Sequence, residues 1–171
     1  CGFLDFLMPK VTSLGNKGII WIIAAIALLC TKKYRKWGIL MIIGLLAGLL
    51  VGNVILKPLI ARPRPCWIDT SVKLLVANPT DYSFPSGHAT VSVAYYGILF
   101  YILLHSISRP VLRNRIRIVA ILFILLIGFS RIYLCVHYLS DVMAGYAIGL
   151  LWFLFSAALL SWLDFRKELR R

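Results

Sequence analysis

Residues 37–56 read WGILMIIGLLAGLLVGNVIL, a run of twenty residues without a single charged side chain. An α-helix rises about 1.5 Å per residue, so a helix of this length is about 30 Å long and matches the hydrocarbon core of a bilayer. In lipid, a helix also pairs its backbone N–H and C=O groups within a single segment. The run therefore predicts a transmembrane helix and an integral membrane protein.

Apolar runs on both sides of this segment extend the pattern. Four further spans are predicted, over residues 18–31, 86–104, 116–134 and 140–163. The first of these has only fourteen residues, which is short for a hydrocarbon core. We therefore expect it to recruit flanking residues by tilting or by snorkelling of side chains.

The segments outside the spans complete the expected architecture. Residues 1–17 mix apolar residues with Asp5 and Pro9, a pattern typical of an amphipathic helix at the membrane interface. Residues 57–85 are polar, contain several prolines and form the longest predicted loop. The expected fold class is an all-α integral membrane protein with a single domain over residues 1–171. It is a bundle of about six helices, with five transmembrane spans and an N-terminal amphipathic or partly spanning helix.

The composition favours a membrane protein and argues against nucleic acid as a partner. Hydrophobic residues make up 61% of the chain and its mean hydropathy is +0.88, whereas soluble domains have about 45–50% apolar residues. The net charge of +13 is divided into short basic clusters between the apolar runs, so no continuous basic face remains for DNA or RNA. The four cysteines show no CxxC spacing and no metal-type pairing with histidine.

The distribution of basic residues predicts an orientation in the membrane. The connections around residues 32–36 and 105–117, together with the C-terminal stretch from residue 166, carry twelve Lys and Arg residues, whereas the opposite side carries seven. The positive-inside rule places the richer side in the cytoplasm. The loop over residues 57–85 and the turn near Tyr138 then face the outside of the cell or a lumen.

Three polar clusters stand at the ends of the predicted spans on that outer side. The first reads KPLIARPRP, from Lys57 to Pro65. A single cation here would be explained as a membrane anchor whose side chain snorkels to the headgroups. Three cations separated by prolines, on the side with less positive charge, are better explained as an anion-binding site. The prolines stiffen the backbone that carries Arg62 and Arg64.

The second cluster is Phe84-Pro85-Ser86-Gly87-His88, directly before an apolar run. Ser86 is predicted as the N-cap of a helix, with Gly87 and His88 in its first turn. A helix N-terminus presents free backbone N–H groups that suit a phosphate oxygen, and Gly87 lets the ligand approach the backbone closely. Taken alone, this cluster fits an ordinary capped helix with a stray histidine equally well.

The third cluster runs from Ser130-Arg131 to Asp141 and contains His137. Charged residues close to membrane depth are costly and by default functional. His137 and Asp141 are four residues apart, so on a helix they would share one face. A carboxylate beside an imidazole fixes its tautomer and stabilises the imidazolium. The structural alternative is a buried ion pair between Arg131 and Asp141.

Together the clusters contain the groups that phosphoryl transfer needs. Lys57, Arg64 and Arg131 can neutralise a phosphoryl group, while His88 and His137 offer a nucleophile and an acid. The remaining histidine falls in an opposite loop. Carboxylates are too few for a dedicated Mg²⁺ site, so neither a metal nor another cofactor is expected.

The three clusters resemble the three signature motifs of the type 2 phosphatidic acid phosphatase family. Those motifs are a Lys, six residues and Arg-Pro; Pro-Ser-Gly-His; and Ser-Arg, five residues, His, three residues and Asp. The matching positions, in the same order, are Lys57, Arg64-Pro65, Pro85-Ser86-Gly87-His88, Ser130-Arg131, His137 and Asp141. By motif the resemblance covers residues 57–141, and by predicted topology it covers the whole chain.

The resemblance implies a role for each matching residue. His137 would attack phosphorus and become a phosphohistidine, with Asp141 orienting it. His88 would protonate the leaving oxygen and then activate water. The implied phosphate-binding residues are Lys57, Arg64, Ser86, Gly87 and Arg131. Arg62 lies outside the fixed positions and is interpreted as supporting charge. The family also implies catalysis without a metal and a six-helix core, whose sixth helix residues 1–17 would supply.

Other classes of protein fit the sequence less well. Vanadate-dependent haloperoxidases carry the same motifs but are soluble, and glucose-6-phosphatases are larger with more spans. A transporter would scatter ionisable groups at mid-membrane, whereas the middle portions of these spans carry none. A catalytically silent lipid-phosphate-binding protein is a further alternative, and the intact His88, His137 and Asp141 argue against it.

The expected activity is that of a lipid phosphatase or diphosphatase that acts within the lipid bilayer. The family implies undecaprenyl diphosphate, phosphatidylglycerol phosphate, phosphatidate and diacylglycerol diphosphate as candidate substrates, with undecaprenyl diphosphate foremost. The expected location is a bacterial plasma membrane that the chain crosses several times. Its C-terminus would lie in the cytoplasm and its active site on the extracytoplasmic face.

Overall fold

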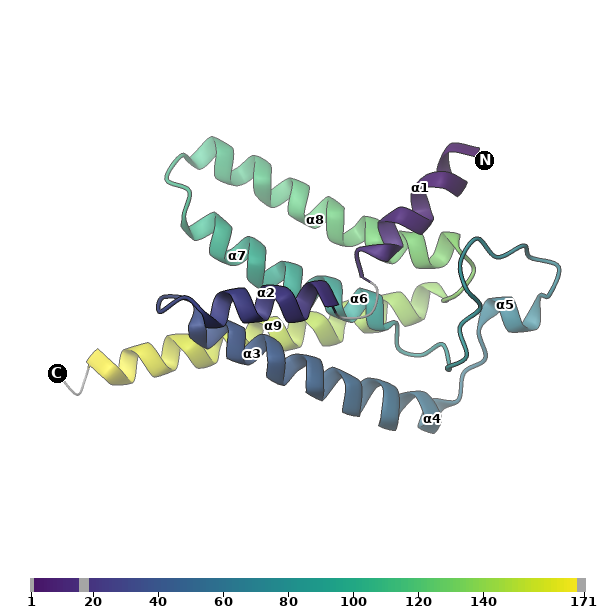
Figure 1. Ribbon diagram of the computed structural model, residues 1–171, viewed down its shortest axis with the longest axis horizontal. Helices are drawn as coiled ribbons and strands as arrows, with labels where there is room; N and C mark the ends of the chain where they lie inside the picture. The colour runs from purple at the N-terminus through teal and green to yellow at the C-terminus, as the bar shows by residue number, and fades with distance from the viewer. Residues whose placement is uncertain (1, 16–18, 169–171) are drawn as a thin grey trace.

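The computed structural model describes residues 2–15 and 19–168, and these residues form helices and connecting segments without a β-strand (Figure 1). Two of the helices, η1 and η2, have the wider π-helical winding. In chain order the elements are α1 (Gly2–Ser13), α2 (Ile19–Leu29), α3 (Arg35–Ala47), η1 (Gly48–Leu56), α4 (Lys57–Ile60), α5 (Pro65–Ile68), α6 (Gly87–Val91), η2 (Ser92–Tyr96), α7 (Gly97–His105), α8 (Pro110–Tyr133) and α9 (Leu139–Glu168).

Four helical stretches are long and apolar enough to cross a membrane. They are Arg35–Ile68, Gly87–His105, Pro110–Tyr133 and Leu139–Leu163. The first contains α3, η1 and α4, which follow one another with right-handed helical backbone at both junctions. These stretches correspond to four of the five spans predicted from the apolar runs.

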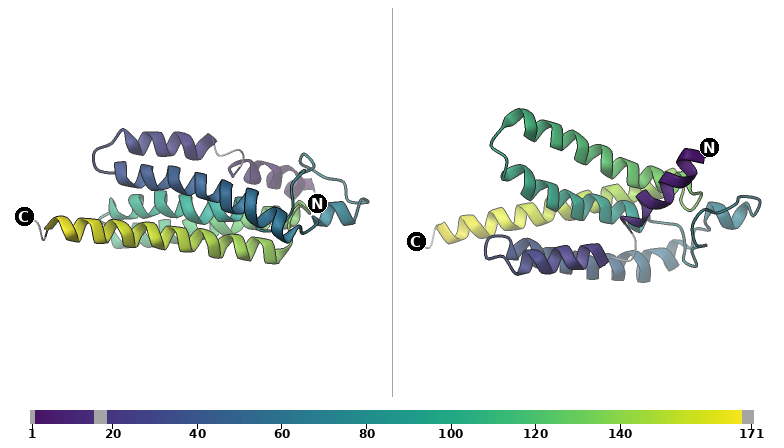
Figure 2. Two further views of the ribbon diagram at one scale, coloured as in Figure 1. Left: turned by 90° about the horizontal axis from the view of Figure 1, so that it is seen from below. Right: turned by 45° about the horizontal axis from the view of Figure 1, so that its top comes forward.

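The predicted span over residues 18–31 is not confirmed. Its described helix, α2, has eleven residues, which makes it about 16 Å long and roughly half as long as the hydrocarbon core is thick. The chain then turns back, with the Thr31 hydroxyl donating to Leu28 O at 2.8 Å and accepting from Tyr34 N–H at 3.2 Å. Because of this turn, α3 returns alongside α2 (Figure 2).

From α2 onward, the connections between the helices gather at two opposite ends of the bundle. α4, α5, the long loop over residues 69–86 and the turn between α8 and α9 lie at one end, which we call the loop end (Figure 1). The α2–α3 and α7–α8 connections lie at the other, the basic end. This division agrees with the two sides predicted from the basic residues. One detail differs: α8 already begins at Pro110, so Arg113 and Arg115 lie on its first turns and not in a loop.

α1 packs on the loop end of α8 and not beside the full length of the bundle (Figure 2). Met8, Val11 and Thr12 are its buried residues. The hydroxyl of Tyr133 donates a hydrogen bond of 2.6 Å to Asp5 Oδ1, which fixes α1 to the last turn of α8. The position of α1 in the membrane interface stays a prediction, but α1 helps to cover the loop end.

Two glycines allow α9 to lie directly on α6. A Cβ atom at Gly145 would lie 2.6 Å from the backbone oxygen of Ser86 and 2.8 Å from Ala89 Cβ, and one at Gly149 would clash with the backbone oxygen of Thr90. Small residues four positions apart let two membrane helices bring their backbones close together. This contact places the start of α6 beside the start of α9.

Candidate active site

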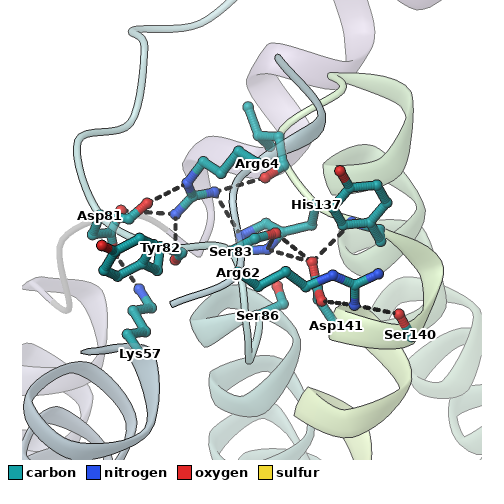
Figure 3. Close-up of polar contacts among 12 residues, drawn as sticks. Lys57, Arg62, Arg64, Asp81, Tyr82, Ser83, Ser86, His137, Ser140 and Asp141 are labelled. Atoms are coloured by element: carbon teal, nitrogen blue, oxygen red, sulfur yellow. Dashed lines mark hydrogen bonds and ion pairs between the residues drawn. The ribbon is translucent and has the colours of Figure 1, made fainter. Parts of the chain in front are cut away.

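The three motif clusters meet at the loop end (Figure 3). Each cluster stands where a helix begins or ends, so the packing of the helices brings the clusters together. Lys57 is the first residue of α4, Arg64 precedes α5, Ser86 precedes α6, Gly87 and His88 begin α6, Arg131 lies in the last turn of α8, His137 lies between α8 and α9, and Asp141 lies in the first turn of α9.

His137 is buried, and its two ring nitrogens have different partners. Nε2 lies 3.1 Å from Arg64 Nη1. A guanidinium group can only donate, so Nε2 accepts this bond and the proton is assigned to Nδ1. Burial lowers the pKa of His137 to about 4, because the imidazolium ion loses solvation there. The imidazole is therefore neutral near pH 7, with a lone pair on Nε2.

Asp141 holds the other side of the ring through a hydroxyl group. Its Oδ2 lies 3.6 Å from His137 Nδ1, which is longer than a hydrogen bond. The Ser83 hydroxyl donates to the same Oδ2 and lies 3.5 Å from Nδ1. Oδ2 also accepts the Tyr138 N–H at 2.9 Å, as a residue at the third helical position does in a capping box.

The proximity of His137 and Asp141 has a different cause from the one predicted. His137 precedes α9, so the two residues do not share a helical face. The turn between α8 and α9 brings them together, with both His137 N–H and Val136 N–H donating to Arg131 O. The predicted neighbours meet, although the predicted helical geometry was wrong.

Arg64 is buried and uses all its donors within the site. Nη1 donates to Val136 O at 2.7 Å and faces His137, while Nε donates to Asp81 O at 2.7 Å. Nη2 donates to Asp81 Oδ1 at 2.7 Å and to Tyr82 O at 3.3 Å. The guanidinium plane is thus fixed between the turn before α9 and the loop over residues 69–86.

Asp81 joins Arg64 to Lys57. The buried Lys57 ammonium pairs with Asp81 Oδ2. Burial alone would raise the pKa of Asp81, but the hydrogen bonds and charges of Lys57 and Arg64 outweigh it and hold this pKa below its ordinary value. The carboxylate is therefore ionised at neutral pH. No sequence motif pointed to Asp81, although the chain has only six acidic residues and this one stands five positions before Ser86.

Ser86 occupies the predicted N-cap position of α6, but its side chain makes no capping bond. Within the described part of the chain, its buried Oγ has no hydrogen-bond partner. Its backbone N–H donates to Asp141 O at 3.1 Å, which ties α6 to α9. A Cβ atom at Gly87 would meet no atom within 4 Å, so the backbone there is open to a ligand. An uncommitted hydroxyl beside open backbone suits an anion.

His88 follows Gly87 and belongs to the same site. Arg131, Lys57 and Arg64 lie near enough for their positive charges to act on it, and His137 is a further neighbour. Its ring packs against Gly15, where a Cβ atom would come within 2.7 Å of His88 Cδ2. The two histidines of the motifs therefore stand in one electrostatic environment.

Arg131 is a buried cation, with 6% of its surface exposed. Its Nη1 donates to the Thr12 hydroxyl of α1, and among the described residues its Nε has no hydrogen-bond partner. The structural alternative, an ion pair with Asp141, is not observed, because Arg62 holds that carboxylate. No described carboxylate lies within 4.0 Å of Arg131.

Arg62 contributes more than the supporting charge predicted for it. Its Nη1 donates to Asp141 Oδ1 at 2.7 Å and to the Ser140 hydroxyl at 2.6 Å. The guanidinium carbon also lies 4.1 Å from the centre of the Tyr138 ring. Ala61, with a φ of 46°, turns the backbone at the end of α4 and directs Arg62 toward α9.

The charge balance of the site favours a phosphoryl group. Four cations, from Lys57, Arg62, Arg64 and Arg131, face the two carboxylates of Asp81 and Asp141. The excess of two positive charges matches a phosphate dianion. Across residues 2–15 and 19–168, no three His, Cys, Asp or Glu side chains are grouped as a metal site requires.

The fold and the site define a helical membrane protein with a histidine-containing anion site at one end. Residues 36–165 match the PAP2 superfamily. An undecaprenyl-diphosphatase of Sulfolobus acidocaldarius is 33% identical over 147 residues, covering 85% of this chain and 66%, slightly under two thirds, of that protein. Phosphatidylglycerophosphatase B of Bacillus subtilis is 31% identical over 156 residues, covering 88% of this chain and 72% of that protein.

Two crystal structures share the fold. A transmembrane PAP2 type phosphatidylglycerolphosphate phosphatase from Bacillus subtilis has a TM-score of 0.75 at 29% identity, covering 93% of this chain and 77% of that chain. Aquifex aeolicus LpxE has a TM-score of 0.69 at 29% identity, covering 91% and 86%. The chain belongs to the PAP2 superfamily, which confirms the resemblance inferred from the motifs. It is a multi-pass membrane protein.

Proposed function

We propose that this protein hydrolyses a phosphate ester or anhydride on a membrane lipid, with His137 as the nucleophile. The observation that carries the proposal is the environment of His137 Nε2. This nitrogen is buried, carries a lone pair and accepts a hydrogen bond from Arg64. It lies within a site that has more cations than carboxylates. A neutral imidazole among cations is suited to attack on phosphorus, because the cations stabilise the charge that develops on the phosphoryl oxygens.

The first half-reaction transfers the phosphoryl group to the protein. His137 Nε2 forms a bond to phosphorus while the bond between phosphorus and the leaving oxygen breaks. His88, in its protonated form, gives its proton to that oxygen. Lys57, Arg64 and Arg131 neutralise the phosphoryl oxygens. The Asp141 carboxylate, 3.6 Å from Nδ1, stabilises the cationic phosphohistidine by its charge.

The second half-reaction returns the protein to its starting state. Neutral His88 accepts a proton from water as the water oxygen attacks phosphorus. The phosphorus–nitrogen bond breaks, His137 recovers its lone pair and inorganic phosphate leaves. Atoms and charges balance over the cycle with water as the only co-reactant, so the proposal includes catalysis without a metal or another cofactor.

The names of the relatives favour two kinds of substrate. One relative is an undecaprenyl-diphosphatase and another a phosphatidylglycerophosphatase, so both an anhydride and a monoester are handled within the family. We therefore propose undecaprenyl diphosphate or a glycerophospholipid phosphate as the substrate. The proposed location of the site is the extracytoplasmic face of a plasma membrane, because the basic end is the end that the positive-inside rule places in the cytoplasm.

The experiment that tests this function measures phosphate release by the purified protein in detergent micelles with excess EDTA. Undecaprenyl diphosphate, phosphatidylglycerol phosphate and phosphatidate are compared at equal surface concentration. We expect turnover of at least one of them in EDTA, and the ranking identifies the preferred lipid. No release from any of them would refute the proposal, and release only after Mg²⁺ is restored would refute the metal-independent route.

Lys36→Ala is expected to leave turnover unchanged. Lys36 lies in the first turn of α3 at the basic end, a bundle length away from the clusters at the loop end. Lys57→Ala is the matched variant at the loop end and should lower turnover strongly, because it removes a cation from the site. Phosphate release by the two variants is compared in detergent. A severe loss in Lys36→Ala would contradict the separation of the two ends.

Gly145→Ala is expected to lower both stability and turnover. The added methyl group would lie 2.6 Å from Ser86 O, and overpacking of this kind costs about 1–3 kcal/mol. Displacing α6 also moves Ser86 and His88 relative to α9. Gly48→Ala is the control, because a Cβ atom there meets nothing within 4 Å. Thermal unfolding in detergent measures the difference, and an unchanged Tm for Gly145→Ala would show that the helices separate without cost.

A further inference from the structure

The loop between α5 and α6 carries a carboxylate onto the cations of the site. Asp81 pairs with Lys57, and its Oδ1 accepts from Arg64 Nη2 at 2.7 Å (Figure 3). Both cations belong to the first motif cluster, which the proposed function uses to bind phosphate. They are therefore already paired with an anion that belongs to the chain itself.

The three partners differ in their exposure to solvent. The side chains of Lys57 and Arg64 are 8% and 3% exposed, whereas that of Asp81 is 50% exposed. A buried cation without an anion carries a large desolvation penalty, so an anionic partner stabilises Lys57 and Arg64 whether or not phosphate is bound. A half-exposed carboxylate can return to water at little cost. Asp81 is therefore the exchangeable member of the cluster.

Arg64 is held in place independently of the Asp81 carboxylate. Its Nη1 donates to Val136 O, its Nη2 also donates to Tyr82 O, and its Nε donates to the backbone oxygen of Asp81. These acceptors are all main-chain oxygens. Only the bond from Nη2 to Oδ1 involves the carboxylate, so one anionic oxygen can replace another there without moving the guanidinium group.

We propose that Asp81 is an exchangeable counter-anion of the phosphate site. Its carboxylate occupies Lys57 and Arg64 between turnovers, the phosphoryl group of the substrate displaces it, and its return helps to expel inorganic phosphate. This inference rests on the proposed function, because it takes Lys57 and Arg64 as phosphate ligands. Asp81 is then a residue that sets the affinity of the site for phosphoryl groups.

The inference predicts that removing the charge of Asp81 tightens phosphate binding. The apparent affinity is the intrinsic affinity reduced by the fraction of molecules whose carboxylate has left, so Asp81→Asn should bind inorganic phosphate about tenfold more tightly if that fraction is about one tenth. Equilibrium binding of radiolabelled inorganic phosphate to the full chain in detergent measures this directly. Asp81→Glu keeps the charge and should bind phosphate as weakly as the wild type.

Asp69→Asn is the matched control within the same loop. The Asp69 carboxylate accepts from the backbone N–H and the hydroxyl of Ser71 at 3.0 Å and 2.6 Å, so it is engaged in a local turn. Its neutralisation removes the same charge from the same loop without touching Lys57 or Arg64. We expect phosphate binding by this variant to equal that of the wild type. Equal tightening in both variants would show a general charge effect and overturn the inference.

The remaining outcomes are also decisive. Unchanged or weaker phosphate binding by Asp81→Asn would identify Asp81 as a structural clamp on Arg64 and overturn the inference, as would failure of this variant to fold. The wild type separates the inference from the proposed function. If the wild type neither binds phosphate nor releases it from a lipid, the proposed function fails. If it does both while Asp81→Asn binds no more tightly, the inference alone fails.

Discussion

His137→Ala is expected to lower the turnover of a lipid phosphate by roughly 10⁴-fold or more, as the loss of a catalytic nucleophile does in other enzymes. The variant keeps the cations of the site but removes His137 Nε2. This is the ring nitrogen to which the contact with Arg64 assigns a lone pair. Because burial lowers the pKa of His137 to about 4, Nε2 stays unprotonated throughout the neutral range. Phosphate release in detergent is the measurement.

His88→Ala provides the comparison that separates the nucleophile from the acid. If His88 protonates the leaving oxygen, its loss should slow hydrolysis of a lipid ester more than that of p-nitrophenyl phosphate, whose leaving group needs no proton. His137→Ala should be inactive on both. Substantial turnover of either substrate by His137→Ala would contradict its role as the nucleophile.

The covalent intermediate offers a readout that does not depend on a variant. A phosphorus–nitrogen bond is broken by acid and survives alkali, unlike the ester of a serine. Wild-type protein mixed with substrate labelled in the phosphoryl group and quenched in alkali should retain label, and His137→Ala should not. Label that survives acid would instead indicate an oxygen ester.

The apolar runs predicted four of the spans because their signal comes from composition and length, which tertiary structure does not alter. The motif residues come together at one end of the bundle for a related reason. Lys57, Ser86, Arg131 and Asp141 each stand where an apolar run begins or ends, and alternation of the runs across the membrane then places them on one side. The span over residues 18–31 was not confirmed, because the described residues that follow Leu29 turn back and do not extend the helix.

The rest of the site could not be predicted from spacing, because it depends on how the loop over residues 69–86 folds back. The backbone N–H of Ser83 donates to Arg62 O at 2.9 Å, which fixes the loop beside the first motif cluster and places Ser83 near His137. Asp81 lies two residues before Ser83 in the same loop, and the folding back of this loop brings its carboxylate to Lys57 and Arg64. The contact between α6 and α9 at Gly145 and Gly149 had a sequence signal, two small residues four apart in an apolar run, but that signal does not name the partner helix.

Arg131→Met is expected to lower turnover by about 10²–10³-fold, the usual effect of removing one group that stabilises charge in the transition state. It is also expected to raise the Tm. The guanidinium is buried, and no described carboxylate lies within ion-pair distance. Replacing a buried, uncompensated charge with an apolar side chain of similar volume removes a desolvation penalty. Thermal unfolding and phosphate release on the same preparation measure both effects.

Arg62→Met is the matched control, because the two arginines differ in what they leave behind. Arg62 pairs with the fully buried Asp141 carboxylate, so its loss leaves that carboxylate without its cation and should lower the Tm. A higher Tm in Arg131→Met and a lower Tm in Arg62→Met would show that Arg131 serves to bind a ligand, whereas Arg62 stabilises the folded site. A lower Tm in Arg131→Met would contradict this, because it would mean that the buried charge stabilises the protein without phosphate. The role of Arg131 would then be structural, exerted through its contact with Thr12 of α1.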